Sequence, residues 1–109
     1  MSKDTFNTGA QRDTQEGKPR FDLIPAHALL RLAALYQRGA DQYGDQNWRK
    51  GMPWQRVLAS LERHLQAFKR GEEGEDHLAA VVFNAMALME YERSHPDLDD
   101  IIDRVKSSK

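Results

Sequence analysis

A chain of 109 residues is long enough for one domain, which would bury roughly 65% of its unfolded-chain surface on folding. Its net charge is −1 and charged residues make up 30% of it, a balance that gives no general reason to bind nucleic acid or an anionic membrane. The absence of cysteine excludes disulfides and thiolate metal sites, so any metal must be held by oxygen or imidazole.

The N-terminal segment, residues 1–16, is polar and rich in Gly, Asn, Gln and Thr, which predicts a flexible arm. It has no apolar signal core, and no later run approaches the roughly 20 apolar residues of a membrane span, so we expect a cytoplasmic protein. Residues 17–109 are predicted to form a single domain, which begins with an extended segment up to Pro25. A first helix is predicted over residues 27–37 from its helical periodicity, with Gly39 as its stop signal.

Three further helices are predicted after a loop dense in Gly, Asp and Asn. The second covers residues 53–70 and carries a regular apolar stripe, and the third covers residues 74–93 and is apolar nearly all round. Asp97 could cap a short fourth helix over residues 98–105. The predicted fold is all-α, a small bundle of about four helices, and its small size favours completion by oligomerisation.

One polar stripe runs along the third predicted helix. When this helix is projected at about 100° per residue, Glu73, Asp76 and Asn84 fall in one sector beside small alanines. Carboxylates on a buried helix need a partner, because unpaired buried charge is prohibitively costly. Carboxylates together with an Asn amide oxygen are typical of a hard-cation site, which suits Mg²⁺ or Mn²⁺.

The second predicted helix should face this stripe, because the short loop between the two helices predicts antiparallel neighbours. Glu62 flanks its apolar stripe on the side that can reach Glu73 and Asp76, and His64 flanks the other edge. An alternative interpretation is that the acidic residues form a solvated first turn, which the helix dipole stabilises. His77 alone is more typical of a structural or solvent-edge histidine than of a ligand.

Basic and aromatic side chains gather before the second helix. They could stack on a base and neutralise phosphates, and they are Lys18, Arg20, Tyr43, Asn47, Trp48, Arg49 and Lys50. The alternative is a loop in which Trp48 plugs the end of the bundle and the charges are solvated. The sequence leaves both interpretations open.

Several segments together resemble a known family. The segment EEGEDHLAAVVFNA, residues 72–85, is similar to the second motif of MazG-type nucleoside triphosphate pyrophosphohydrolases, a Glu-x-x-Asp that falls here on Glu73 and Asp76. More specifically, the chain resembles the dATP/dGTP diphosphohydrolases, which are small MazG-like proteins common in phages and prophages. The segments that carry this resemblance are GKPRFDLIP (17–25), YGDQNWRKG (43–51), RHLQAF (63–68) and HLA (77–79).

The resemblance implies an all-α dimer or tetramer that uses Mg²⁺ or Mn²⁺ to hydrolyse purine (deoxy)nucleoside triphosphates, of the dGTP or dATP type, to the monophosphate and pyrophosphate. It implies catalytic and metal-binding roles for Glu73 and Asp76, joined on geometric grounds by Glu62, with Glu72 as a supporting metal ligand. The residues then expected to bind the substrate are Lys18, Arg20, Asn47, Trp48, Arg49, Lys50, His64, His77 and Asn84.

The sequence departs from the family pattern at two positions. The second helix lacks the Glu-x-x-Glu that the broader superfamily usually carries, and offers Glu62 alone. Ala80 stands where members of the small family often have a second histidine. These departures leave the metal ligands contributed by the second helix open.

A different class of function also stays open, a non-catalytic helical module of phage origin that regulates or binds another protein. A nucleic-acid binder is disfavoured by the balanced charge. An enzyme requires the carboxylates to converge within about 2.0–2.6 Å of a shared ion, whereas an interaction module lets them point apart.

Overall fold

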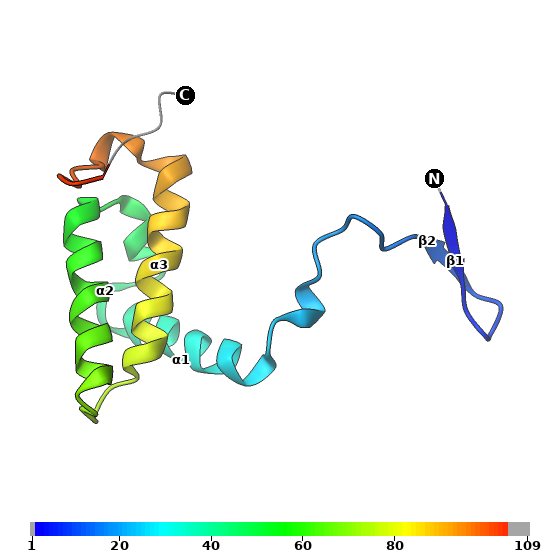
Figure 1. Ribbon diagram of the computed structural model, residues 1–109, viewed down its shortest axis with the longest axis horizontal. Helices are drawn as coiled ribbons and strands as arrows, with labels where there is room; N and C mark the ends of the chain where they lie inside the picture. The colour runs from blue at the N-terminus through cyan, green and yellow to red at the C-terminus, as the bar shows by residue number, and fades with distance from the viewer. Residues whose placement is uncertain (1, 105–109) are drawn as a thin grey trace.

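The computed structural model describes residues 2–104 and shows a mostly helical protein (Figure 1). Its elements in chain order are β1 (Lys3–Thr5), β2 (Gln11–Asp13), η1 (Phe21–Leu23), α1 (Ala26–Tyr43), η2 (Asn47–Lys50), α2 (Trp54–Lys69), α3 (His77–Ser94) and η3 (Pro96–Leu98). The prediction of a helical bundle is confirmed, but the described residues form three α-helices rather than four. None of the helices in this described part is both long and apolar enough to cross a membrane.

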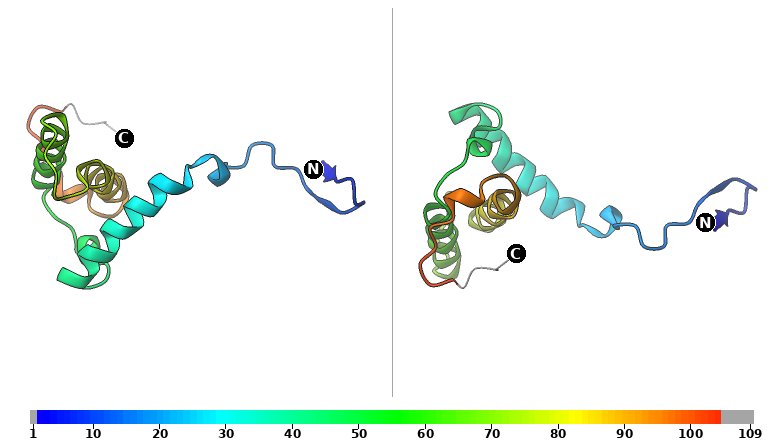
Figure 2. Two further views of the ribbon diagram at one scale, coloured as in Figure 1. Left: turned by 90° about the horizontal axis from the view of Figure 1, so that it is seen from below. Right: turned by 90° about the horizontal axis from the view of Figure 1, so that it is seen from above.

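The N-terminal residues form a short antiparallel hairpin, in which Lys3 of β1 lies opposite Asp13 of β2. The sequence did not predict it, because strands of three residues are too short to show an alternating pattern. The hairpin and the segment that follows it extend away from the helices (Figures 1 and 2). Within that segment Arg20 donates two hydrogen bonds to the carboxylate of Asp22, at 2.8 and 2.7 Å.

The first helix, α1, is longer than predicted because Gly39 does not end it. Gly39 lies inside the helix with open space beside its Cα atom. The helix ends at Gly44, which has a φ of +94° and donates its N–H to the carbonyl of Ala40 at 2.8 Å. A glycine adopts such a left-handed conformation without strain, so the chain can turn here. α1 packs on α3.

The second and third helices lie side by side and run antiparallel (Figure 1). Their core is formed by Trp54 and Val57 of α2 with Ala87 and Tyr91 of α3. Partly buried side chains from η2 and from the segment after α3 cover this core at one end of the helix pair. The apolar stripe predicted on the second helix therefore meets the third helix as its antiparallel neighbour.

The start of α3 corrects the prediction of a helix over residues 74–93. Gly74 has a φ of +104°, and the carboxylate of Asp76 accepts a hydrogen bond from the N–H of Ala79 at 3.1 Å, so α3 begins only at His77. The acidic residues 72–76 therefore lie in a loop. The projection that aligned Glu73 with Asp76 on one helix face does not apply to them.

The fourth helix predicted over residues 98–105 does not form within the described residues, and residue 105 lies outside them. The chain makes only the short turn η3. Asp100 accepts a hydrogen bond from the N–H of Gln55 at 2.8 Å, and Asp99 accepts one from a backbone N–H two residues later at 3.2 Å. Aspartates that bond to backbone groups in this way compete with helix formation, and here Asp100 satisfies a free N–H in the first turn of α2.

The loop that contains η2 is tied to the end of α3. The hydroxyl of the fully buried Tyr91 donates to the carbonyl of Trp48 at 2.5 Å. The indole N–H of Trp54 donates to the carbonyl of His95 at 3.0 Å, and a ring nitrogen of His95 donates to the carbonyl of Arg49 at 2.9 Å. The Trp48 ring packs against the core cluster, as the interpretation of a plug at the end of the bundle predicted.

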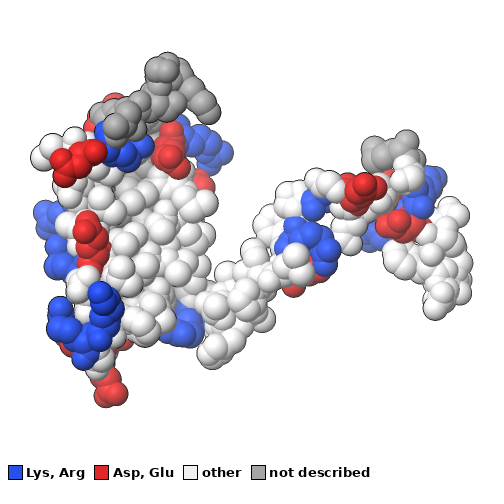
Figure 3. Space-filling model, viewed as in Figure 1, with Lys and Arg blue, Asp and Glu red and all other residues white. Residues whose placement is uncertain are grey.

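Apolar side chains stay exposed on the outer surface of the helix pair. They are Val82, Met86 and Met89 of α3 and Leu65 and Phe68 of α2. Figure 3 shows a broad uncharged surface over α2 and α3, with Lys, Arg, Asp and Glu gathered toward its edges. A monomer rarely exposes so continuous an uncharged face without a use for it.

Replacing Tyr91 with Phe should lower the free energy of unfolding by about 1–2 kcal/mol, because the partly buried Trp48 carbonyl loses its donor while the ring keeps its packing. The control is Tyr43→Phe, since that side chain is 64% exposed and its loss of a hydroxyl should matter by less than about 0.5 kcal/mol. Urea unfolding followed by circular dichroism measures both variants. Equal effects would contradict a structural role for the Tyr91 hydroxyl.

Candidate functional site

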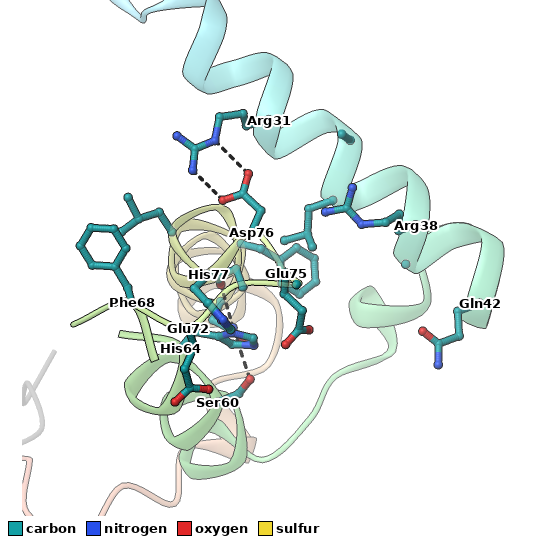
Figure 4. A pocket seen from close by; sticks show the side chains of 18 of the residues that line it. Arg31, Arg38, Gln42, Ser60, His64, Phe68, Glu72, Glu75, Asp76 and His77 are labelled. Atoms are coloured by element: carbon teal, nitrogen blue, oxygen red, sulfur yellow. Dashed lines mark hydrogen bonds and ion pairs between the residues drawn. The ribbon is translucent and has the colours of Figure 1, made fainter. Parts of the chain in front are cut away.

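A groove lies between α1 and α2, with α3 as its floor (Figure 4). Its volume is about 1160 Å³. Its polar lining consists of Arg31, Arg38 and Gln42 from α1, Ser60 and His64 from α2, Glu72, Glu75 and Asp76 from the loop before α3, and His77 and Asn84 from α3. The groove therefore brings guanidinium, carboxylate and imidazole groups together from segments far apart in the sequence.

Two histidine rings meet at the α2–α3 side of the groove. The Nδ1 atoms of His64 and His77 lie 3.0 Å apart, so one ring donates to the other. His77 is only 8% exposed, and its Nε2 is buried with no hydrogen-bond partner. Glu75 lies beside the pair, and each of the three residues offers one potential ligand atom within 4.8 Å of the others. This cluster is suited to holding a cation.

Asp76 joins α1 to the start of α3. Besides capping α3, its carboxylate accepts two hydrogen bonds from Arg31, at 2.8 and 2.7 Å (Figure 4). The pKa of Asp76 is lowered to about 2, chiefly by these bonds from Arg31; partial burial opposes the shift, and the N–H of Ala79 and the charges of Arg31 and Arg38 add to it. The carboxylate is therefore fully ionised at neutral pH and already committed to an arginine.

The neighbouring carboxylates are not equivalent. Glu72 forms an ion pair with Arg70 at 2.5 Å. Glu75 is exposed at the mouth of the groove and forms no ion pair among the residues that the structure describes. Glu73 forms no ion pair among the described residues either, but only Glu75 of the two lines the groove, so Glu75 is the carboxylate of this loop with the most capacity to bind a ligand there.

A second hollow of about 720 Å³ adjoins the groove on the side of η2. Aromatic rings line it, and Tyr36 makes edge-to-face contacts with Phe83, at a centroid distance of 4.9 Å, and with Trp48, at 6.4 Å. Arg56 and Arg63 of α2 also line it. This hollow offers flat apolar walls together with positive charge.

Asn84 lies where the two hollows meet, and it lines both. Its side-chain amide donates to the carbonyl of Ala80 at 2.8 Å and lies 3.5 Å from the hydroxyl of Ser60. Ser60 and Phe83 line both hollows as well. The two hollows thus adjoin along these shared residues, and we refer to them together as the channel, with a polar end and an aromatic end.

Many of the residues predicted from the sequence come together here. The groove is lined by Glu72, His64, Asp76, His77 and Asn84, and the aromatic hollow by Asn47 and Trp48. Glu62 lines a third hollow on the α2 side. Glu72, Glu75 and both histidines also line this hollow, but Asp76 does not.

Other predicted residues lie outside these three hollows. Lys18 and Arg20 lie in the segment between the N-terminal hairpin and α1, and Lys50 and Glu73 are exposed. The guanidinium of Arg49 lies over the ring of Trp48, at 4.6 Å from its centroid. These side chains are not brought to the groove in this conformation.

Sequence reasoning missed Arg31 and Arg38 and did not single out Glu75 as a ligand. A signal for the arginines was present, because they are seven residues apart on α1 and so share one helix face. A signal for Glu75 was present too, because Gly74 and the capping residue Asp76 mark a loop at this point. The ion pair of Arg31 with Asp76 has no signal in the sequence, since 45 positions separate them.

Residues 8–101 match the model of a protein family described as dATP/dGTP diphosphohydrolase, N-terminal. The matched range includes all of α1, α2 and α3 and therefore the whole lining of both hollows. Comparison with curated proteins and with solved structures gives no match.

Replacing Asp76 with Asn should lower the free energy of unfolding by about 1 kcal/mol, because Asn still caps α3 but loses the ion pair with Arg31. The effect is modest because the Arg31 side chain is 43% exposed and water screens the pair. Asp76→Ala, which also loses the cap, should cost about 2 kcal/mol. Urea unfolding measures both.

Asp22→Asn is the matched control, because it breaks a similar bidentate pair with Arg20 in the arm, where both side chains are exposed and no α-helix is capped. This variant should change the stability by less than about 0.5 kcal/mol. If Asp76→Asn costs no more than Asp22→Asn, Asp76 does not hold α1 against α3.

Proposed function

The chain belongs to the dATP/dGTP diphosphohydrolase family, and we propose that it is a metal-dependent enzyme that hydrolyses a purine deoxynucleoside triphosphate to the monophosphate and pyrophosphate. The observation that carries this proposal is the adjacency of the polar groove and the aromatic hollow, which share lining residues. A nucleotide has the same division into a charged and an aromatic end. A channel of this composition could therefore bind both parts of it at once.

The arginines of α1 are suited to the phosphates. Arg31 and Arg38 line the polar end of the channel. A guanidinium binds phosphate oxygens through two parallel hydrogen bonds and stays charged at any physiological pH. We assign the outer phosphates to these side chains, which would leave the α-phosphate beside the loop that carries Glu75.

The aromatic hollow is suited to the purine. Tyr36, Tyr43 and Trp48 line it, and aromatic rings stack on a base or pack edge-on against it. Arg56 and Arg63 add positive charge on the same side. In the orientation that we propose, the base of the substrate lies near η2 and the triphosphate lies near the start of α3.

The residues at the polar end fit a divalent cation, since His64, Glu75 and His77 each offer a ligand atom within 4.8 Å of the others. When bound, a divalent cation would neutralise charge that develops on the phosphates. Glu72 and Asp76 border this position, whereas Glu62 and Glu73 stay predicted ligands whose side chains lie outside the groove.

The remaining chemistry falls to side chains of the groove. Glu75 would accept a proton from the attacking water. It would also orient this water toward the α-phosphorus, in line with the leaving pyrophosphate. Arg31 and Arg38 would stabilise the charge that accumulates on the leaving group. The apolar walls of Phe83 and Leu35 would limit the access of other water molecules.

The wild-type protein with Mg²⁺ or Mn²⁺ should release pyrophosphate and a deoxynucleoside monophosphate from dGTP or dATP. Arg38→Gln should lower kcat/KM by about 10- to 100-fold, because one charged hydrogen bond to phosphate is worth about 1.5–3 kcal/mol. Arg93→Gln is the control, since Arg93 pairs with Glu90 outside the groove and its loss should leave activity unchanged. Enzymatic detection of pyrophosphate and anion-exchange chromatography of the nucleotides measure the reaction.

Two results would contradict the proposal. Release of orthophosphate without pyrophosphate would show cleavage at a different bond. Nucleotide binding without turnover, for every purine triphosphate with each of Mg²⁺, Mn²⁺, Zn²⁺ and Co²⁺, would favour the non-catalytic module.

The enzyme is further proposed to assemble as a homodimer or homotetramer through the exposed face of α2 and α3. Val82, Met86 and Met89 are 46%, 39% and 65% exposed on a helix that has no Lys, Arg, Asp or Glu between His77 and Met89. A chain of 12.5 kDa is stabilised when a second copy covers such an apolar surface, because a small domain has little core of its own.

Light scattering after size-exclusion chromatography should therefore give a mass two or four times that of the chain. The double substitution Val82→Lys and Met86→Lys should shift the protein to the monomer, because it buries charge in the interface. Phe6→Lys is the control, since Phe6 is also exposed but lies in the hairpin. A wild type that elutes as a monomer at micromolar concentration, or a shift caused equally by Phe6→Lys, would contradict this assembly.

A further inference from the structure

Within the proposed active site, the arrangement of donors differs from the carboxylate set that the sequence predicted. We propose that His64, Glu75 and His77 form a cation site selective for a first-row transition metal, such as Zn²⁺ or Co²⁺, over Mg²⁺. The inference deepens the proposed function and rests on it for the role of the ion. Its binding test is independent of catalysis.

The first support is the separation of the two imidazole rings. Two nitrogens bound to one ion at about 2.1 Å lie about 3.0 Å apart at a right angle and about 3.4 Å apart at the tetrahedral angle that Zn²⁺ favours. The Nδ1 atoms of His64 and His77 are 3.0 Å apart in the structure. The two rings thus already stand at the spacing of adjacent ligands, and an ion would replace their mutual hydrogen bond without moving α2 from α3.

The second support is the unsatisfied nitrogen of His77. Among the described residues, its Nε2 is the buried side-chain polar atom that lacks a hydrogen-bond partner. A neutral imidazole has one donor and one acceptor, so the contact with His64 satisfies only half of a side chain that is 8% exposed. His77 is thus a buried imidazole whose hydrogen-bonding capacity the protein leaves half unused, as expected of a side chain with a role beyond packing.

The third support is the way in which the neighbouring carboxylates are engaged. Asp76 gives both carboxylate oxygens to Arg31, and Glu72 pairs with Arg70. Glu75 forms no ion pair within the described chain and lies beside the histidines, after a glycine whose φ is +104°. It is the carboxylate that completes a set of two imidazoles and one oxygen donor.

The donor set determines the choice of metal. Imidazole nitrogen suits Zn²⁺ and the other late first-row ions, whereas Mg²⁺ prefers oxygen ligands and loses its water reluctantly. Three protein ligands leave positions open for water or for a phosphate oxygen of a nucleotide in the groove. The site is therefore expected to bind the metal before, and without, the nucleotide.

Isothermal titration of the untagged, metal-free protein with Zn²⁺, Co²⁺ or Mg²⁺ alone tests the proposal. Zn²⁺ and Co²⁺ should each bind at least 100-fold more tightly than Mg²⁺. Glu75→Gln and His77→Gln should each weaken Zn²⁺ binding at least tenfold, and Glu75→Gln keeps the test valid if the buried His77→Gln fails to fold. His27→Gln is the matched control, because His27 is an exposed histidine of α1 outside the groove, and its affinity should be unchanged.

The four histidines also provide an internal readout. In proton–nitrogen spectra of the imidazole rings, Co²⁺ should shift the signals of His64 and His77 at lower concentration than those of His27 and His95. Equal affinity for Mg²⁺ and Zn²⁺, or Zn²⁺ binding that Glu75→Gln leaves intact, would overturn the metal site. Zn²⁺ binding with these properties in a protein that hydrolyses no nucleotide would support the site and overturn only the proposed function.

Discussion

The groove exists because α1 is held across α3 and away from α2. Three contacts hold it: the ion pair of Arg31 with Asp76 near its first turns, the edge-on packing of Tyr36 on Phe83 near its middle, and the tie of the following loop to Tyr91. If α1 lay directly against α2, the apolar packing would close the channel. The contacts that hold α1 therefore also create the space in which a ligand can bind.

Asp76 is central to this arrangement because it serves two elements at once. Its carboxylate caps α3 and holds Arg31, and the low pKa that results keeps it charged. The cost is that Asp76 is less available as a metal ligand than the Glu-x-x-Asp pattern suggests. The acidic loop is thus divided between a structural carboxylate and Glu75, which remains available at the groove.

The sequence predicted the helices well and the site only in part. Helical periodicity identified the three α-helices, the short loop predicted their antiparallel pairing, and the ordered motifs identified the family. The stripe of Glu73 and Asp76 was wrong as a helix face, because a glycine and a capping aspartate delay α3 by three residues relative to the predicted start at residue 74. Residues such as Arg31 reach the groove through tertiary contacts, which local patterns do not encode.

We propose that one channel holds both an ion at His64, Glu75 and His77 and a purine nucleotide along the aromatic wall. Anomalous diffraction from a crystal grown with Zn²⁺ and a non-hydrolysable dGTP analogue tests this proposal most directly. We expect one metal peak between the two imidazoles and Glu75, with the triphosphate between that peak and Arg38 and the base beside Trp48. A metal peak at Glu62 and Glu73, or nucleotide density outside the channel, would contradict it.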